Sequence, residues 1–208
     1  MEESIQVEGI RGILHRPEHP DGSALALTHG AGSDCRSLLL SHLARAFEAA
    51  GTLVLRYDLP YRQEGRKSPP LPSAQHRDRE GVVRAVEFLR SQANGTVIAG
   101  GHSYGGRQTA MAAAGNPELA DALLLLSYPL HPPDQPQKLR TGFFPDWRTP
   151  ALFVHGTRDP FGSLDEMRDA LRLIPARVQL LPAEGAAHDL KRADPAAVVE
   201  HLRALVLS

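Results

Sequence analysis

The residues with the clearest chemical potential form the pentapeptide Gly101-His102-Ser103-Tyr104-Gly105. An apolar run over 97–99 precedes it and a helical pattern follows it, so the serine falls on a sharp turn between a strand and a helix. Such a turn exposes the serine hydroxyl, and the glycines remove the Cβ atoms that would clash where the backbone doubles back. Ser103 is therefore a candidate nucleophile that needs a base to take its proton.

A histidine is the expected base, and position along the chain singles out one of the ten that are present. His188 lies in a loop after the last predicted strand. The others fall near the N-terminus, within or next to helices, inside the serine turn, or before a glycine at a strand end. His29 and His155 belong to the last group, and we interpret both as structural. His188 is thus the predicted general base.

An acid must hold the imidazole in the correct tautomer, and Asp159 is the first candidate. It follows the strand before the last one, which gives the chain order serine, acid, histidine that is typical of this arrangement. An ordinary turn aspartate before Pro160 is the alternative interpretation. Asp134, after the preceding strand, is the second candidate acid. Asp189 is expected to cap a turn.

The negative oxygen that forms on an attacked carbonyl needs hydrogen-bond donors that are already in position. The N–H of Tyr104, at the start of its helix, is the first predicted donor. The second is the N–H of Ala31 in His29-Gly30-Ala31-Gly32, which directly follows the strand over 25–28. Together these two N–H groups form the predicted oxyanion hole.

Short apolar strands alternate with helical periodicities along the whole chain. Residues 5–7 and 10–14 are predicted to form an antiparallel pair joined at 8–9. The remaining strands are expected near 25–28, 53–55, 96–99, 123–126, 152–154 and 178–181. Helices are expected around 39–50, 82–89, 104–114 and 164–174 and from 194 to the end, with a loop over 60–74. Ser33 or Asp34 is expected to cap the first helix, and Ser163 the fourth. This pattern predicts an α/β protein with a mostly parallel sheet covered on both faces.

Composition excludes several other classes of function. The chain has 208 residues, 23 basic and 24 acidic, with a net charge of −1, so no global field favours nucleic acid or a membrane. The single cysteine and the N-terminal sequence indicate a cytoplasmic protein, and the length fits one domain over 1–208. Neither metal-ligand spacing nor a phosphate-binding glycine loop is present, so catalysis without a cofactor or metal is expected.

At this point the residues resemble the α/β-hydrolase superfamily. The resemblance rests on His-Gly-Ala-Gly, Gly-His-Ser-Tyr-Gly-Gly, His-Gly-Thr-Arg-Asp-Pro-Phe-Gly and Ala-Ala-His, in that order, and covers 24–190. The dienelactone-hydrolase-like branch is the most similar. The stretch 126–133 is similar to small hydrolase-like proteins that include a testis-expressed protein and a domain of a chromatin-complex subunit. The resemblance implies Ser103, Asp159 and His188 as a triad. Dienelactone hydrolases are known for a cysteine nucleophile, so lactone substrates are not implied here.

Several residues near the expected site are candidate substrate contacts. Many hydrolases insert a helical cap between the strands expected at 123–126 and 152–154, but here the proline-rich insert is too short for a large cap. Trp147, with the two preceding phenylalanines, either walls the open site or anchors the loop to the core. Tyr61 is a tentative substrate contact, with a structural hydrogen-bonding role as its alternative. Arg107 is a tentative contact for an anionic group, as is Arg62, with a solvated surface role as the alternative.

The sequence thus predicts a serine hydrolase that cleaves a carboxylic ester, or a related acyl bond, through an acyl-enzyme. Its expected partner is a small ester molecule, and monomer and homodimer remain open. A catalytically silent interaction module with the same fold is one alternative, since fold alone does not prove function. A small peptidase or amidase is the other.

Overall fold

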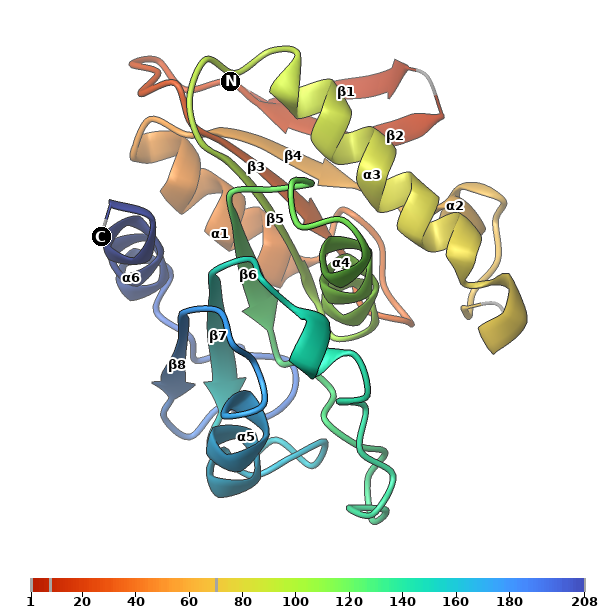
Figure 1. Ribbon diagram of the computed structural model, residues 1–208. Coiled ribbons are helices and arrows are strands. Elements are labelled where there is room, and N and C mark those ends of the chain that lie inside the picture. The colour runs from red at the N-terminus through yellow and green to blue at the C-terminus, as the bar shows by residue number, and fades with distance from the viewer. Residues whose placement is uncertain (1, 8, 70, 208) are drawn as a thin grey trace.

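The centre of the protein is one eight-stranded sheet, as a computed structural model that describes residues 2–7, 9–69 and 71–207 shows (Figure 1). The strand order is β1-β2-β4-β3-β5-β6-β7-β8. The two pairs that involve β2 are antiparallel, and the other five neighbouring pairs are parallel. The predicted mostly parallel sheet is confirmed. The turn expected at 8–9 includes Glu8, which lies outside the described residues.

The strands and helices follow the alternating apolar pattern of the sequence. The strands are β1 (Glu2–Val7), β2 (Ile10–His15), β3 (Ala24–Thr28), β4 (Leu53–Tyr57), β5 (Val97–His102), β6 (Ala122–Leu126), β7 (Ala151–Gly156) and β8 (Val178–Ala183). The helices are α1 (Leu38–Ala49), α2 (Pro60–Gln63), α3 (His76–Arg90), α4 (Tyr104–Gly115), α5 (Leu164–Leu171) and α6 (Pro195–Leu207), with 3₁₀ turns η1 (Pro72–Ala74) and η2 (Phe144–Asp146).

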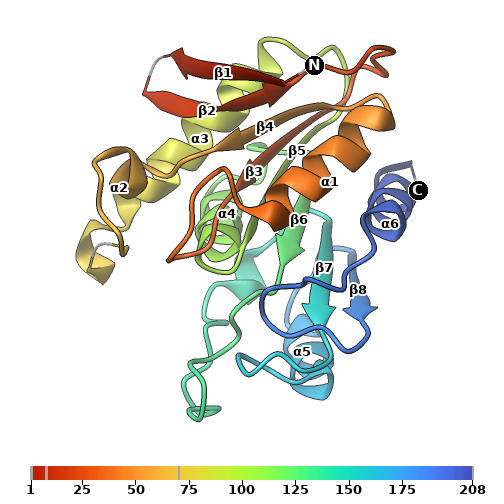
Figure 2. The same ribbon diagram turned by 180° about the vertical axis from the view of Figure 1, so that it is seen from behind.

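Helices cover both faces of the sheet, because its central strands are apolar on both sides. In β6, Leu124 and Leu126 pack in one buried cluster with residues of α1 and α6, whereas Leu123 and Leu125 pack in the other with residues of α3, α4 and α5. Figure 2 shows α1 and α6 on the near side of the sheet. This three-layer arrangement brings the carboxyl ends of the parallel strands to one edge, where sites of such folds lie.

Two local expectations were wrong. Helix α1 begins at Leu38, and its cap is Ser37, whose Oγ accepts the N–H of Leu40 at 3.4 Å. Asp34 instead accepts the N–H of Arg36 at 2.8 Å and closes a preceding turn. The loop expected over 60–74 contains α2 and η1, which are too short to produce a helical pattern in the sequence.

The segment between β6 and β7 carries only the short η2, so the absence of a large cap domain is confirmed. Its buried Tyr128 and Phe144 pack on each other, with ring centroids 5.5 Å apart. This segment therefore folds onto the core beside α4 and leaves the edge above β5 without a helical cover. Among the described helices, none is long and apolar enough to span a bilayer.

Candidate active site

Ser103 lies on a strained turn between β5 and α4. Its backbone has φ 51° and ψ −114°, a left-handed φ that non-glycine residues rarely adopt. A Cβ on Gly101 would lie 2.8 Å from the N of Gly106, and one on Gly105 would lie 2.4 Å from the carbonyl oxygen of His29. Only glycine fits at both positions. The strain is retained where it exposes the serine side chain, as at functional sites in general.

The structure brings Ser103, His188 and Asp159 together in one line of hydrogen bonds. His188 Nδ1 lies 2.8 and 3.0 Å from the two carboxylate oxygens of Asp159, and its Nε2 lies 2.7 Å from the hydroxyl oxygen of Ser103. A carboxylate only accepts, so Nδ1 carries the proton and Nε2 is free to accept the serine hydroxyl proton. This is the geometry of a nucleophile, a base and an orienting acid.

Asp159 is held as a carboxylate inside the protein. Its side chain has no exposed surface, and burial by itself opposes the charge. The hydrogen bond from His188, the charge of that ring and the N–H of Phe161 outweigh burial and keep the pKa of Asp159 below its ordinary value. The N–H of Phe161 donates to Oδ1 at 2.9 Å. An ionised carboxylate is the form that can orient the imidazole.

Two residues without a predicted role, His102 and Phe161, contact the predicted base. His102 donates from Nε2 to the carbonyl oxygen of His188 at 2.8 Å, and Phe161 stacks on the His188 ring with centroids 4.2 Å apart. Nothing in the sequence reveals these contacts, because the loop that carries His188 is remote from 102 along the chain. The one hint in the sequence is that His102 is adjacent to Ser103, which places it near the site without indicating its partner.

The predicted oxyanion donors lie on two segments that pack against each other. A Cβ on Gly30 would lie 2.8 Å from Nδ1 of His102 and 3.5 Å from Cβ of Ser103, so the loop after β3 runs directly over the serine turn. Tyr104 is the first residue of α4, a position whose N–H has no acceptor within the helix. The carbonyl of Gly30, in the same peptide unit as the Ala31 N–H, accepts from His29 Nδ1 at 2.9 Å.

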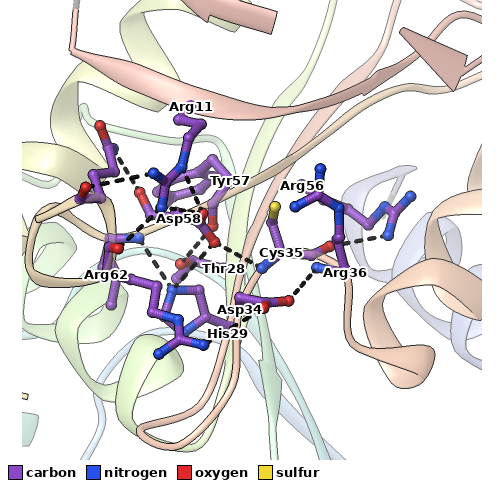
Figure 3. Close-up of polar contacts among 12 residues, drawn as sticks. Arg11, Thr28, His29, Asp34, Cys35, Arg36, Arg56, Tyr57, Asp58 and Arg62 are labelled. Atoms are coloured by element: carbon purple, nitrogen blue, oxygen red, sulfur yellow. Dashed lines mark hydrogen bonds and ion pairs between the residues drawn. The ribbon is translucent and has the colours of Figure 1, made fainter. Parts of the chain in front are cut away.

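The loop after β3 is also anchored to the start of the segment that follows β4 (Figure 3). Asp58 accepts the N–H of Cys35 at 2.8 Å and Nε of Arg11 at 3.0 Å. Arg56 donates to the carbonyl of Cys35 at 2.9 Å. Burial, together with the Asp58 charge, raises the pKa of the Cys35 thiol to about 12. Cys35 and Asp58 thus have structural roles in anchoring this loop.

Two of the four tentative substrate contacts, Tyr61 and Trp147, are buried. Tyr61 is buried, and its hydroxyl donates to the carbonyl of Ala31 at 2.8 Å, which matches its structural alternative. Trp147 is fully buried against Phe143, and its Nε1–H donates to Thr149 at 2.7 Å. A ring enclosed in this way has no free surface for a substrate, so the wall interpretation is wrong and the anchor interpretation holds.

The remaining candidates are spread around the site. Arg107 is half-buried one turn after Ser103, with its guanidinium beside Tyr128. Arg62 lies 3.6 Å from Asp34 in an ion pair. Asp189 accepts the N–H of Lys191 at 3.3 Å, in the turn role expected of it. Asp134 is exposed at φ 58°, whereas Asp159 holds the position beside His188.

A pocket of about 360 Å³ lies near the predicted nucleophile, although Ser103, Asp159 and His188 do not line it. It lies between the start of α1 and the loop that leads into α6, and its apolar wall comes from both segments: Leu38, Leu39, Leu43, Leu190, Ala193 and Pro195. His102 also lines it, so the pocket reaches the residue next to the nucleophile. Within the part of the chain that the structure describes, no cluster of His, Cys, Asp and Glu is arranged to hold a metal ion.

Comparisons with known proteins agree with this fold. A family model described as an alpha/beta hydrolase domain matches residues 21–201. No curated protein sequence matches significantly. A dienelactone hydrolase from Anabaena variabilis ATCC 29413 is a similar solved structure, with 24% identity, a TM-score of 0.76 and coverage of 98% of this chain and 94% of that one. Est1E from Butyrivibrio proteoclasticus is 16% identical, with a TM-score of 0.77 and coverage of 100% and 99%. XC6422 from Xanthomonas campestris, described as an a/b serine hydrolase without lid, is 16% identical, with a TM-score of 0.73 and coverage of 98% and 91%.

Proposed function

The chain belongs to the alpha/beta hydrolase family, and from this premise we propose that it is a serine hydrolase that cleaves a carboxylic ester. One observation carries the proposal. The Ser103 hydroxyl lies 2.7 Å from His188, and His188 lies 2.8 Å from the buried carboxylate of Asp159. These contacts support the proposal, because a nucleophile, a base and an orienting acid must touch in this sequence in a catalytic triad.

The proposed reaction has two halves. In the first, Ser103 Oγ attacks the ester carbonyl while His188 Nε2 takes the hydroxyl proton. The N–H groups of Ala31 and Tyr104 stabilise the negative oxygen of the tetrahedral intermediate. His188 then gives its proton to the leaving alcohol, and an acyl-serine remains. In the second half, His188 takes a proton from water, water attacks the acyl carbonyl, and Ser103 leaves with the proton of His188 as the carboxylic acid is released.

The surroundings of the triad favour esters that carry an apolar group. The segment between β6 and β7 provides no lid, and four leucines, Ala193 and Pro195 line the pocket of about 360 Å³ beside His102. The other residues that line this pocket are polar. A short alkyl or aryl group fits a pocket of this size and chemistry. A contact between Arg107 and a negatively charged part of the substrate remains a prediction, as does the relation to the small hydrolase-like sub-family.

A fluorophosphonate probe tests the nucleophile, since it labels only activated serines. The wild type is expected to be labelled and to turn over p-nitrophenyl esters, whereas Ser103→Ala should lose both. Ser91→Ala, at the exposed end of α3, is the matched control and should behave like the wild type. Equal labelling of wild type and Ser103→Ala would overturn the assignment.

The same protein distinguishes the two alternatives. An interaction module would show neither labelling nor turnover over a panel of esters and thioesters. A peptidase or amidase would cleave a p-nitroanilide at a rate comparable with the p-nitrophenyl ester of the same acyl group. We expect the ester to be cleaved far faster, because nothing in the proposed mechanism favours the poorer leaving group.

A further inference from the structure

Tyr61 is a buried residue that connects three segments around the site. It lies in α2, and its side chain has only 2% of its surface exposed. Its hydroxyl donates to the carbonyl oxygen of Ala31 at 2.8 Å, and its backbone N–H donates to Oδ1 of Asp78 at 3.2 Å. Tyr61 therefore joins the loop after β3 to α3.

Asp78 receives a second bond from the residue that follows the nucleophile. The hydroxyl of Tyr104 donates to Oδ2 of Asp78 at 2.7 Å, and the carboxylate is 1% exposed. No ion pair within the described residues links Asp78 to an arginine or lysine. A buried carboxylate is costly unless it is hydrogen-bonded, and the donors that satisfy this one come from Tyr61 and Tyr104.

The aromatic rings lock the same residues by packing. Tyr61 meets Tyr104 edge to face, with centroids 5.9 Å apart, and meets His29 in the same way at 5.7 Å. Edge-to-face pairs of this kind restrict both rings. One side chain thus contacts the two segments that carry the proposed oxyanion donors.

The bonds at Ala31 fix the direction of its N–H. In the peptide unit before Ala31, the carbonyl oxygen belongs to Gly30. It accepts hydrogen bonds from His29 Nδ1 at 2.9 Å and from the N–H of Ser33 at 3.1 Å. The peptide unit after Ala31 is held at its carbonyl by Tyr61. Because peptide units are planar, holding the units on both sides leaves the Ala31 backbone little freedom to turn.

We propose that Tyr61 is a positioning residue for the oxyanion hole, which with Asp78 keeps the N–H groups of Ala31 and Tyr104 in one fixed relation. This inference rests on the proposed function. Tyr61 itself touches no reacting atom, so its effect comes through the aim of the two donors. Preorganised donors of this kind lose much of their effect when they are misaligned.

The test removes one hydroxyl and compares two substrates. Tyr61→Phe keeps the ring and deletes the bond to Ala31, and we expect kcat/KM for an oxoester to fall about tenfold, less than the roughly 10²–10³-fold cost of losing a donor outright. The matched thionoester carries C=S in place of C=O, and sulfur is the weaker acceptor. Its hydrolysis depends less on the donors, so Tyr61→Phe should slow it much less.

The matched control is Tyr128→Phe. Tyr128 is also fully buried, and its hydroxyl donates to the carbonyl of Arg140 at 2.6 Å. This variant removes the same kind of bond, but its ratio of oxoester to thionoester kcat/KM should equal that of the wild type. A thermal melt of both variants shows whether they fold. Asp78→Asn is the second variant and should lower the ratio in the same direction if Tyr61→Phe does not fold.

The outcomes separate the two proposals. A wild type without turnover and without Ser103 labelling overturns the proposed function and, with it, this inference. If the wild type is active and Tyr61→Phe has the same ratio of oxoester to thionoester kcat/KM as the wild type, only the inference is overturned. Equal slowing of both esters assigns Tyr61 to the general stability of the site and also overturns the inference. A ratio that falls severalfold in Tyr61→Phe and not in Tyr128→Phe supports it.

Discussion

The ring of Phe161 lies against the imidazole of His188, with centroids 4.2 Å apart and 30° between the planes. The N–H of the same phenylalanine donates to Asp159 at 2.9 Å. One residue therefore contacts both the predicted acid and the predicted base. The turn that carries it is closed by His155, whose Nε2 donates to the carbonyl of Gly162 at 2.7 Å. The turn that carries Phe161 therefore holds the predicted base from the side of Asp159.

Removing the Phe161 ring should free the imidazole without removing the backbone bond to Asp159. We expect Phe161→Ala to lower kcat by about tenfold or more, because small misplacements of a catalytic group are costly. Phe161→Leu, which keeps an apolar side chain against the imidazole, should lower kcat less. Steady-state kinetics on a short p-nitrophenyl ester measure both. Phe143→Leu, a half-buried ring stacked on Trp147, is the control, and a Phe161→Ala kcat within twofold of wild type contradicts the prediction.

His102 supports the base from the other side, through its bond to the backbone of His188. His102→Ala deletes the donor and should lower kcat about tenfold while the protein stays folded, since the loop over 186–190 loses one anchor. His102→Gln offers an amide N–H to the same carbonyl and should recover part of the loss. His201→Ala, on the exposed face of α6, should match the wild type. Equal kcat for His102→Ala and the wild type would exclude a positioning role.

The fold and the proximity of the three predicted site residues could be predicted, because the carboxyl ends of parallel strands lie at the same edge of a sheet. Ser103, Asp159 and His188 each follow a different strand of one sheet, so strand ends alone predict that they meet. The contacts of His102 and Phe161 with His188 could be recognised only from the conformations of the loops. A histidine inside the serine turn and a phenylalanine after a proline carry no pattern that indicates a contact with a remote imidazole.

Where the sequence left a role open or placed it wrongly, the outcome depended on tertiary packing or on local turn geometry. Trp147 lies in a proline-rich segment without periodicity, so the sequence left its wall and anchor roles equally open. Tyr61 lies in a four-residue helix, too short to produce a helical pattern. Helix α1 is capped by Ser37 and not by Asp34, because the Asp34 carboxylate already accepts the N–H of Arg36 in the preceding turn.

Stability should fall on mild acidification. Burial lowers the pKa of four histidines below the ordinary 6.5: His15, His29, His102 and His155. The unfolded chain then binds more protons than the folded one once the pH falls below about 6.5, at roughly 1.4 kcal/mol per pH unit for each extra proton. The stability is fully present above that pH and is lost as the pH decreases.

Urea unfolding at pH 7.5, 6.0 and 5.0 measures this loss. The lowered pKa of Asp159 adds a further decrease only below about pH 4, where this carboxylate takes up a proton in the unfolded chain before it does so in the folded one. A free energy of unfolding that stays constant between pH 7.5 and 5.0 contradicts the prediction.

Gly156 at the end of β7 permits the close approach of the loop that carries the base. A Cβ there would lie 2.5 Å from the carbonyl oxygen of Ala186 and 2.6 Å from that of Ala187. The loop cannot retreat freely, because the carbonyl of Ala186 also accepts the N–H of Arg158 at 2.9 Å. Gly156→Ala should therefore cost about 1–3 kcal/mol of stability, as overpacking does, and should lower kcat by displacing His188.

Gly115→Ala gives the matched comparison, because a Cβ at that position meets nothing within 4 Å. Gly115 is the last residue of α4, and alanine there should stabilise the protein by about 0.5–1 kcal/mol and leave kcat unchanged. Chemical denaturation and ester kinetics on the two variants measure both quantities. If Gly156→Ala were as stable and as active as the wild type, the contact between β7 and the His188 loop would not restrict the base, since the added methyl group would have found room without moving it.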